Sequence, residues 1–432
     1  MKSVHIHTLG CRVNQYDSQV LRELGERAGY TWVDDPARAS LVVLVSCTVT
    51  AAADTSVRRL IRRFRRLNPQ ATIALVGCLP SRVQDLPADL VLGNRDKFRV
   101  FERLEDQDKA SPRRREGTKE GGNTRNVHWP IPISSFAGHR RPILKVQDGC
   151  GFACSFCAVP GVRGGSLSRP RAEILEEARI LAGKGARELV LAGVQLSSYG
   201  LDLGLKADAP RLAPLVEALL KVPGVKRVRL SSYGVAGFEA GLLSLVGEED
   251  GLCPHFHLPL QSGDEGILRA MKRPYSLVGF RRVVDAIRRS ISRAGLTTDV
   301  IAGFPGETPE AFRNTLDRIR ELGFRDLHAF PYSERPGTEA TGIEPKVPVG
   351  VVRERIAELL TLKREIVEAS AREAEGEIRW VVEEDHSPGY SGGTTAEGLR
   401  VIFQGKGGKP GGESRVRLGK IRKGQIQAVR VE

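Results

Sequence analysis

The sequence lacks any long, uninterrupted apolar run. Its first residues, MKSVHIHTL, do not form the apolar core of a secretion signal. No stretch approaches the roughly 20 apolar residues that a membrane-spanning helix needs. Hydrophobic residues still make up 41% of the 432 residues, enough for ordinary buried cores, and the length suggests two or three domains. We therefore expect a cytoplasmic protein that does not associate with a membrane.

Cysteine is scarce, with seven residues in the chain. An odd number cannot pair completely, and disulfides are rare in the cytosol. A disulfide scaffold is therefore not expected, and metal ligation or catalysis is the predicted use of these thiols.

Acidic residues are in deficit. The chain has 66 Lys and Arg against 52 Asp and Glu, a formal net charge of +14. A surplus of this size favours a polyanionic partner such as nucleic acid. The alternative is that the arginine runs form a solvated helix face and serve only solubility.

Three cysteines stand in the run CGFACSFC, with the spacing C-x3-C-x2-C: Cys150, Cys154 and Cys157. Three thiolates held this close can ligate three irons of a 4Fe–4S cluster and leave the fourth iron open for a reactant. The aromatic Phe156 directly precedes the last cysteine. A redox dithiol, or a structural zinc site completed by a histidine, would be the simpler alternatives.

The first hundred residues alternate strand and helix patterns. Apolar runs at 4–9, 41–45 and 72–76 are separated by helical patterns at 18–28 and 56–67. This alternation predicts a parallel sheet with covering helices, a Rossmann-like domain.

Three further cysteines, Cys11, Cys47 and Cys78, come after these three strands. Because ligands bind at the carboxyl ends of the strands in open α/β sheets, the three thiols are expected to converge there as a second metal site. Gly10 and Gly77 precede two of them and permit close backbone approach. The alternative is that the cysteines are small buried hydrophobes.

A charged, glycine-rich linker is expected at 105–135, followed by six strand–helix units within 136–370. Six such units fit a partial (β/α)6 barrel, whose catalytic groups lie at the carboxyl ends of its strands. The CGFACSFC run follows the first of these strands, as this fold requires. The predicted strands are 143–147, 188–192, 227–231, 255–260, 298–302 and 326–330, and the predicted helices are 172–182, 212–221, 278–294 and 309–322.

A long helix at about 348–370 leads into a predicted small all-β domain at 371–432. Short strand-like pieces at 379–382, 399–403 and 427–431 between glycine-rich turns suggest an OB-like barrel, an architecture that often binds oligonucleotides. The alternative is a cap that serves only stability. The basic residues of this domain are Lys406, Lys409, Arg415, Arg417, Lys420, Arg422 and Lys423.

With both cysteine sets placed, the whole chain resembles the methylthiotransferases. These are radical S-adenosylmethionine (SAM) enzymes with an N-terminal methylthiotransferase domain, a radical SAM barrel and a C-terminal TRAM domain, which correspond here to 1–104, 136–370 and 371–432. The resemblance covers nearly the full length, and the motifs that carry it are LGCRVNQYDS (9–18), CGFACSFC (150–157), GVQLSSYG (193–200), HLPLQSGDEGILRAMKRPY (257–275), IAGFPGETPEAF (301–312) and FPYSERPGTEA (330–340).

The resemblance implies two 4Fe–4S clusters. One binds SAM and cleaves it to a radical, and the other carries the sulfur that joins carbon 2 of an adenine in tRNA. A reductase or flavodoxin-type electron donor and a sulfur-supply system are the further partners implied. By the resemblance, Cys150, Cys154 and Cys157 hold the SAM cluster, Cys11, Cys47 and Cys78 hold the auxiliary cluster, and Phe156, Gln261, Ser262 and Gly303 lie near SAM.

Within the family, CRVNQYDS together with GNRDK (93–97) looks most like the bacterial branch that acts on N6-threonylcarbamoyladenosine beside the anticodon. Unstacked anticodon-loop bases suit single-strand recognition, and the arginine-rich helix near Arg62 would contact phosphates. The alternatives are isopentenyladenosine in tRNA, an aspartate of ribosomal protein S12 or, in another class, a non-catalytic Fe–S protein that binds RNA.

Two segments depart from the family pattern. Gly234 stands where a glutamate is common, and VPGVRGGSLSRP (159–170) is looser than usual; both are expected near the mouth of the active site. Separately, Cys253, His255 and His257 alternate, so a strand would place them on one face, as a zinc site or as barrel packing. Cys253 is not expected to ligate a cluster.

Overall fold

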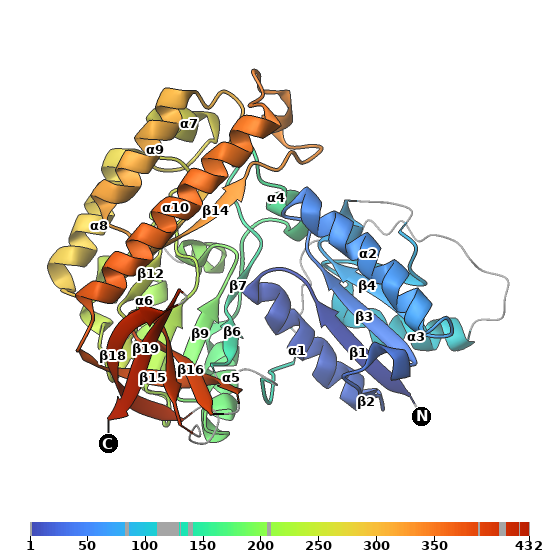
Figure 1. Cartoon of the computed structure of the whole chain (residues 1–432). Helices are drawn as coiled ribbons and strands as arrows, with labels where there is room; N and C mark the ends of the chain where they lie inside the picture. Colours follow the sequence, from blue (N-terminus) through green and yellow to red (C-terminus); the bar gives the residue numbers. More distant parts are fainter. Residues whose placement is uncertain are drawn as a thin grey trace. The chain divides into compact units, whose positions relative to one another are not determined.

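The computed structural model describes residues 2–82, 86–109, 129, 131–136, 141–204, 209–387, 389–405, 412–422 and 424–431 (Figure 1). The chain divides into two compact units, the first comprising 1–134 with 158–165 and the second 135–157 with 166–432. The second unit begins one residue before the predicted barrel boundary. Residues 158–165, which the sequence assigns to the barrel, group instead with the first unit.

The first unit is built on a five-stranded parallel sheet of order β2-β1-β3-β4-β5. The central strands β3 and β4 are apolar and almost wholly buried, as expected for a parallel sheet covered on both faces. The strands are β1 (Ser3–Thr8), β2 (Thr31–Trp32), β3 (Leu41–Ser46), β4 (Thr72–Gly77) and β5 (Leu90–Gly93).

Helices cover both faces of this sheet, so the predicted Rossmann-like domain is confirmed. Leu21 and Phe101 pack on one face, whereas Ile61 and Phe64 pack on the other. Helix α3 continues to Lys109, so the first residues of the predicted linker are helical. The helices are α1 (Arg12–Arg27), α2 (Ala51–Leu67) and α3 (Val100–Lys109), with α4 (Val159–Arg163) formed by the later segment.

Helices α1 and α2 both begin about one and a half turns earlier than predicted. The first turns of α1 bury the polar residues Asn14 and Asp17 beside Val13 and Tyr16, and these polar residues interrupt the apolar periodicity. Helix α2 starts after Thr50, whose side chain accepts a hydrogen bond from the Ala53 N–H in an N-cap.

The second unit contains the predicted partial barrel, with parallel strands in the order β6-β9-β10-β12-β13-β14. A single parallel bridge between Ser232 and His257 joins its two halves. The barrel strands are β6 (Ile143–Lys145), β9 (Glu188–Ala192), β10 (Arg227–Leu230), β12 (His255–His257), β13 (Gly295–Ala302) and β14 (Asp326–Pro331). The helices are α5 (Arg171–Gly183), α6 (Leu212–Leu220), α7 (Glu265–Ala270), α8 (Leu277–Ser290) and α9 (Pro309–Leu322).

Several short strands and 3₁₀ turns lie outside the main strands and helices. Strand β11 (Gly251–Leu252) pairs with β10, and β7 (Gln147–Asp148) pairs with β8 (Leu167–Ser168). Single 3₁₀ turns in the two units span Pro36–Arg38, Leu79–Ser81, Lys97–Arg99, Leu196–Ser198, Leu201–Leu203, Ala240–Leu245 and Glu339–Gly342.

The long helix α10 (Val349–Glu373) leads into a closed five-stranded β-barrel of order β15-β16-β17-β19-β18, which confirms the predicted small all-β domain. Two of its strands, β16 and β18, were not predicted. Strand β16 is glycine-rich and gives no strand pattern, whereas the polar–apolar alternation of β18 was a usable signal. The strands are β15 (Ile378–Ser387), β16 (Tyr390–Thr395), β17 (Arg400–Gln404), β18 (Glu413–Arg422) and β19 (Gln425–Val431). Lys406, Lys409 and Lys423 lie outside the described residues.

Buried ion pairs attach this β-barrel to the amino-terminal ends of the (β/α) strands. Glu188 accepts hydrogen bonds from Arg227 and Arg229, and Arg227 also pairs with Glu413 of β18. Arg229 donates to the carbonyl oxygens of Thr395 and Ala396. Because breaking a buried ion pair is strongly destabilising, these contacts hold the two parts of the second unit together.

No helix of the described ranges is long and apolar enough to cross a membrane.

Candidate iron–sulfur sites and their surroundings

The first cysteine set meets at one edge of the parallel sheet. Cys11 caps the start of α1 just after β1, Cys47 follows β3 and Cys78 follows β4, and these three strands are neighbours. Burial raises the pKa of the Cys47 thiol to about 11, and the proximity of Cys11 and Cys78 contributes to this rise. Residues 67 positions apart in sequence are therefore brought together, as the sequence predicts.

Two glycines allow this convergence. Gly10 has a φ of +102°, and a Cβ atom there would lie 2.7 Å from the Cys47 Cβ and 3.0 Å from its Sγ. Gly77 has a φ of +104°, and a Cβ there would lie 2.9 Å from the Ser46 carbonyl oxygen. Both positions combine a left-handed backbone with a close approach that a larger residue would obstruct.

A buried asparagine ties the cysteine-bearing loops together. The Asn14 side-chain amide donates to the carbonyl oxygens of Leu9, at 2.7 Å, and Ser46, at 3.0 Å. Its oxygen accepts a hydrogen bond from Arg163, which comes from the 158–165 segment. The Arg163 charge also acts to lower the pKa of Cys47, so a cation lies near this thiol.

The two stretches that suggested a substrate branch, CRVNQYDS and GNRDK, meet beneath the same site. Lys97 donates to Asp17 at 2.5 Å and to the Asn94 side chain at 2.9 Å, and the Lys97 and Asp17 side chains are 2% and 0% exposed. Arg163 Nη1 lies 3.8 Å from Asp17 Oδ2, so the guanidinium group near Cys47 connects this pair to the cysteine site. The Lys97 and Asp17 side chains are too deeply buried to read a substrate directly, which the sequence did not reveal.

The second cysteine set lies on one loop of the second unit. Ser155 anchors this loop: its N–H donates to the Met271 carbonyl at 3.1 Å, its hydroxyl donates to Ala270 at 2.7 Å, and its carbonyl accepts from the Ala340 N–H at 2.8 Å. The Cys157 N–H closes a turn onto the Cys154 carbonyl at 3.0 Å. Cys150, Cys154 and Cys157 are all partly exposed.

A partly buried arginine contacts this set. Arg273 Nη1 donates to the Cys154 Sγ at 3.1 Å, and Arg273 Nε donates to the Tyr275 hydroxyl at 3.1 Å. Tyr275 in turn donates to the carbonyl oxygens of Pro259 and Leu260. The guanidinium group thus places a positive charge beside Cys154, and cysteine binds iron as the negatively charged thiolate. Both sets thus place three cysteines near a guanidinium group, and the chemistry of these donors fits a three-thiolate cluster.

The four residues expected near SAM differ from one another in their surroundings. Phe156 packs against Phe304, with ring centroids 6.5 Å apart. Ser262 is fully buried, and its hydroxyl lies 3.3 Å from the Thr315 hydroxyl while accepting from the Asp264 N–H. Ser262 therefore stabilises the turn after β12, and its hydroxyl points into the protein.

Gln261 and Gly303 both adopt positive φ angles, +66° and +79°. The Gln261 backbone bridges to β13, accepting from the Ile301 N–H at 2.9 Å. A Cβ at Gly303 would lie 2.4 Å from Val352 of α10, and the Gly303 N–H donates to Glu307. The GFPGE turn is thus packed tightly against α10.

At Gly234, which departs from the family pattern, a neighbouring side chain fills the space beside the glycine. A Cβ at this position would lie 2.1 Å from the Gln195 side-chain nitrogen, so Gln195 occupies the space that a side chain at 234 would take. Gln195 is held by a hydrogen bond from its side-chain nitrogen to the Ser197 hydroxyl at 2.8 Å. A polar amide therefore stands beside the position where the family has a carboxylate.

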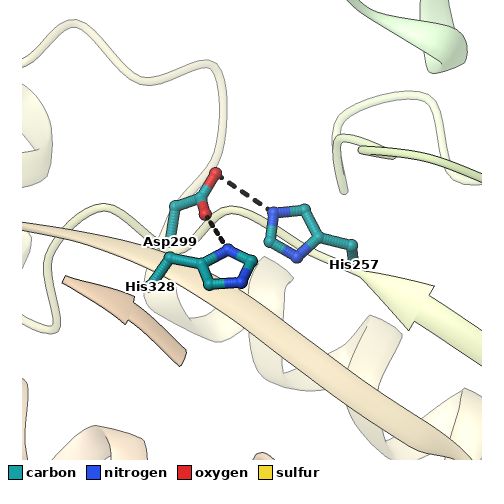
Figure 2. A group of neighbouring side chains, drawn as sticks. All are labelled: His257, Asp299 and His328. Carbon is teal, nitrogen blue, oxygen red and sulfur yellow. Dashed lines mark hydrogen bonds and ion pairs between the residues drawn. The ribbon is translucent and has the colours of Figure 1, made fainter. Parts of the chain in front are cut away.

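One polar cluster was not predicted. His257 of β12 and His328 of β14 both contact the carboxylate of Asp299 on β13 (Figure 2). Of the two interpretations of Cys253, His255 and His257, barrel packing is the one that Cys253 fits, because it lies outside β12 beside Arg229 and is fully buried. Burial raises the pKa of the Cys253 thiol to about 12, which agrees with its exclusion as a cluster ligand.

Helix α2 presents a row of arginines to solvent. Together with Thr55, Ile61 and Pro87, they line a surface groove of about 920 Å³. Arg65 pairs with Asp89, whereas its neighbours in the groove make no ion pair among the described residues. The groove arginines are Arg58, Arg59, Arg62, Arg65 and Arg66.

Two family models match the chain. The model described as "Uncharacterized protein family UPF0004" covers residues 3–91, and that of the Radical SAM superfamily covers residues 144–319. The solved structure of the radical SAM methyltransferase TsrM from Kitasatospora setae shares the fold, with a TM-score of 0.52 and 14% identity over 91% of this chain and 81% of that chain.

Curated relatives extend the match to nearly the whole chain. "Threonylcarbamoyladenosine tRNA methylthiotransferase MtaB" is 32% identical in Bacillus subtilis, over 94% of this chain and 91% of that protein, and 37% identical in Thermotoga maritima, over 82% and 80%. "tRNA-2-methylthio-N(6)-dimethylallyladenosine synthase" of Syntrophotalea carbinolica is 32% identical over 94% and 98%. The chain belongs to the methylthiotransferase family of radical SAM enzymes, whose cofactors are SAM and 4Fe–4S clusters.

Proposed function

We propose that this enzyme inserts a methylthio group at carbon 2 of N6-threonylcarbamoyladenosine in tRNA, beside the anticodon. The observation that carries the choice of substrate is the resemblance of CRVNQYDS and GNRDK to this branch. The structure joins the two stretches through the buried ion pair of Asp17 with Lys97. The substrate named for the Bacillus subtilis and Thermotoga maritima relatives supports the same choice.

We assign one 4Fe–4S cluster to each cysteine set. Cys150, Cys154 and Cys157 would hold the cluster that binds SAM, and Cys11, Cys47 and Cys78 would hold the auxiliary one. When bound, these cofactors supply radical cleavage of SAM and the sulfur to be inserted. The protein provides two separately anchored thiol sets, each with an arginine nearby that offsets thiolate charge.

Substrate RNA would be held by charge. The α2 arginines without ion pairs are suited to phosphates, as are the basic strands of the C-terminal β-barrel, which we regard as a TRAM domain at 371–432. Each phosphate contact adds to the salt dependence of binding. Replacing Arg59 and Arg62 with glutamine should weaken tRNA binding and reduce its salt dependence without changing the iron content.

The reaction also needs partners that this chain does not contain. The reductive cleavage of SAM requires an external one-electron donor, for which a reductase or flavodoxin-type protein in the cytoplasm is suited. Repeated turnover requires a sulfur-supply system. Within the chain we place the domain limits at 1–104 and 136–370, with 105–135 between them.

A second candidate substrate is isopentenyladenosine in tRNA, because the Syntrophotalea carbinolica relative is as similar over the same share of the chain as the Bacillus subtilis relative. The two candidates differ only in the group on N6, so one experiment separates them. An aspartate of a ribosomal protein is less favoured, because these relatives are all named for tRNA products.

The test is anaerobic reconstitution with iron and sulfide, followed by incubation with SAM, reductant and tRNA bearing either nucleoside. Two 4Fe–4S clusters require about eight irons per chain. Nucleoside mass spectrometry should find the 2-methylthio product only from threonylcarbamoyladenosine. Product only from isopentenyladenosine would move the enzyme to the other branch. Cys253→Ala, which removes a cysteine outside both sets, is the matched control and should retain all the iron.

A further inference from the structure

Three side chains from neighbouring barrel strands converge on one point (Figure 2). His257 Nε2 lies 3.1 Å from Asp299 Oδ2, and His328 Nδ1 lies 3.1 Å from Asp299 Oδ1. One nitrogen from each imidazole and one oxygen of the carboxylate all fall within 4.8 Å of one another. Strand register fixes the arrangement, since Asp299 and His328 are directly paired and His257 is paired with Thr297.

The charge of Asp299 is not balanced by a permanent cation. Its side chain is 22% exposed, and its contacts within the described ranges are the two imidazoles, with no lysine or arginine. Burial acts to raise the pKa of Asp299, but hydrogen bonds from His257 and His328 outweigh it and hold the pKa below the usual range. A carboxylate that is only 22% exposed is normally paired or coordinates a metal.

We propose that His257, Asp299 and His328 form a binding site for one divalent transition-metal ion, of the Zn²⁺ class. Two imidazoles and one carboxylate are the donors that such ions accept. The ion would compensate the negative charge of the Asp299 carboxylate. This site uses no cysteine, so it is separate from both cluster sites.

The surroundings of the three ligands suit this role. His257 Nδ1 lies 2.9 Å from the Thr297 hydroxyl, so the nitrogen opposite to the proposed ligand atom is already engaged, as is usual for metal-bound histidines. The His328 side chain is 52% exposed, which leaves room for water or another oxygen ligand at the remaining coordination positions.

The site lies on a strand face that continues into the apolar packing around the SAM-cluster loop. Along β13, Thr297, Asp299 and Ile301 alternate with the more deeply buried Thr298 and Val300, so they share one face of the strand. Ile301 packs in the same apolar group as Phe156, the residue before Cys157. Asp299 and Ile301 are neighbours on this face. The ion would thus lie next to the apolar group that packs around the SAM-cluster loop.

The competing explanation is protonation. One imidazolium could balance Asp299 without any metal, and the same hydrogen bonds would be present. The two explanations differ in whether the purified protein retains a divalent ion, which can be measured independently of methylthiolation.

The experiment uses the full chain with its clusters assembled anaerobically. Elemental analysis measures zinc, manganese, cobalt and nickel beside iron, and a Co²⁺ titration follows the d–d absorption bands. We expect about one non-iron ion per chain, with bands free of thiolate charge transfer, because the ligands are N and O donors. His328→Gln and Asp299→Asn should each weaken Co²⁺ binding by about 100-fold or more.

Asp326→Asn is the matched control, because Asp326 is a carboxylate on the same strand as His328 but pairs with Lys363. Its Co²⁺ affinity should equal that of the wild type. His328 is half exposed, so its replacement should leave folding and iron content intact even if Asp299→Asn does not. Wild-type protein that binds no Co²⁺, or binds it as well as His328→Gln does, would overturn the site and favour the protonated pair.

Discussion

The two cysteine sets solve the same chemical problem with opposite structural means. Cys150, Cys154 and Cys157 lie within eight residues, and one loop anchored through Ser155 is enough to hold them. Cys11, Cys47 and Cys78 are brought together by three parallel strands and by Asn14, which bridges two of the loops. A local site depends on loop geometry, whereas a dispersed site depends on the whole sheet.

The largest effect should follow from removing the local site. We expect Cys154→Ala to abolish SAM cleavage and all methylthiolation and to lower the iron content from about eight to about four per chain, because a cluster with two thiolates is not retained. Release of 5′-deoxyadenosine and iron are the measurements. Normal SAM cleavage by this variant would contradict the assignment of the set.

A substitution in the dispersed site should separate SAM cleavage from methylthiolation. Cys47→Ala should also retain about four irons, yet it should still cleave SAM while forming no 2-methylthio product. The same two assays apply. Equal loss of SAM cleavage and thiolation, with the second unit's cluster intact, would contradict the division of labour between the sets.

Asn14→Ala should weaken only the dispersed site. It leaves two loop carbonyls without their donor, at a cost of about 1–3 kcal/mol each when buried. We expect partial loss of the auxiliary iron and a lower thermal midpoint for the first unit, with SAM cleavage unchanged. Asn68→Ala, which also removes side-chain bonds to two loop carbonyls of the same unit, is the control and should keep its iron.

The smallest effect should come from Arg273, which tunes the local site without ligating iron. Hydrogen bonds to cluster sulfurs raise the reduction potential. Arg273→Gln should therefore lower the potential of the SAM cluster, reducing the reduced fraction about tenfold at fixed potential, or about 59 mV for one electron. The neighbouring Lys272→Gln, an exposed cation paired with Glu339, should not shift it. An unchanged potential in Arg273→Gln would rule out this role.

Helix lengths in the first unit show where sequence patterns stop being informative. The N-terminal turns of α1 bury Asn14 and Asp17, which lie beside the cysteine site. Because these residues are polar, the sequence pattern there resembled that of a loop. By contrast, α9 was predicted with its observed limits, because Thr308 caps it and Gly323 ends it within an apolar repeat.

The sequence by itself determined the local chemistry: the C-x3-C-x2-C loop, the alternation that builds both α/β parts, and the glycines before Cys11 and Cys78. These depend on spacing along the chain. Only the tertiary structure decided that Lys97 pairs with Asp17, that Arg273 reaches Cys154, and that His257, Asp299 and His328 meet. Those contacts join side chains 29 to 119 residues apart, and no local pattern encodes them, because they arise from strand order and register.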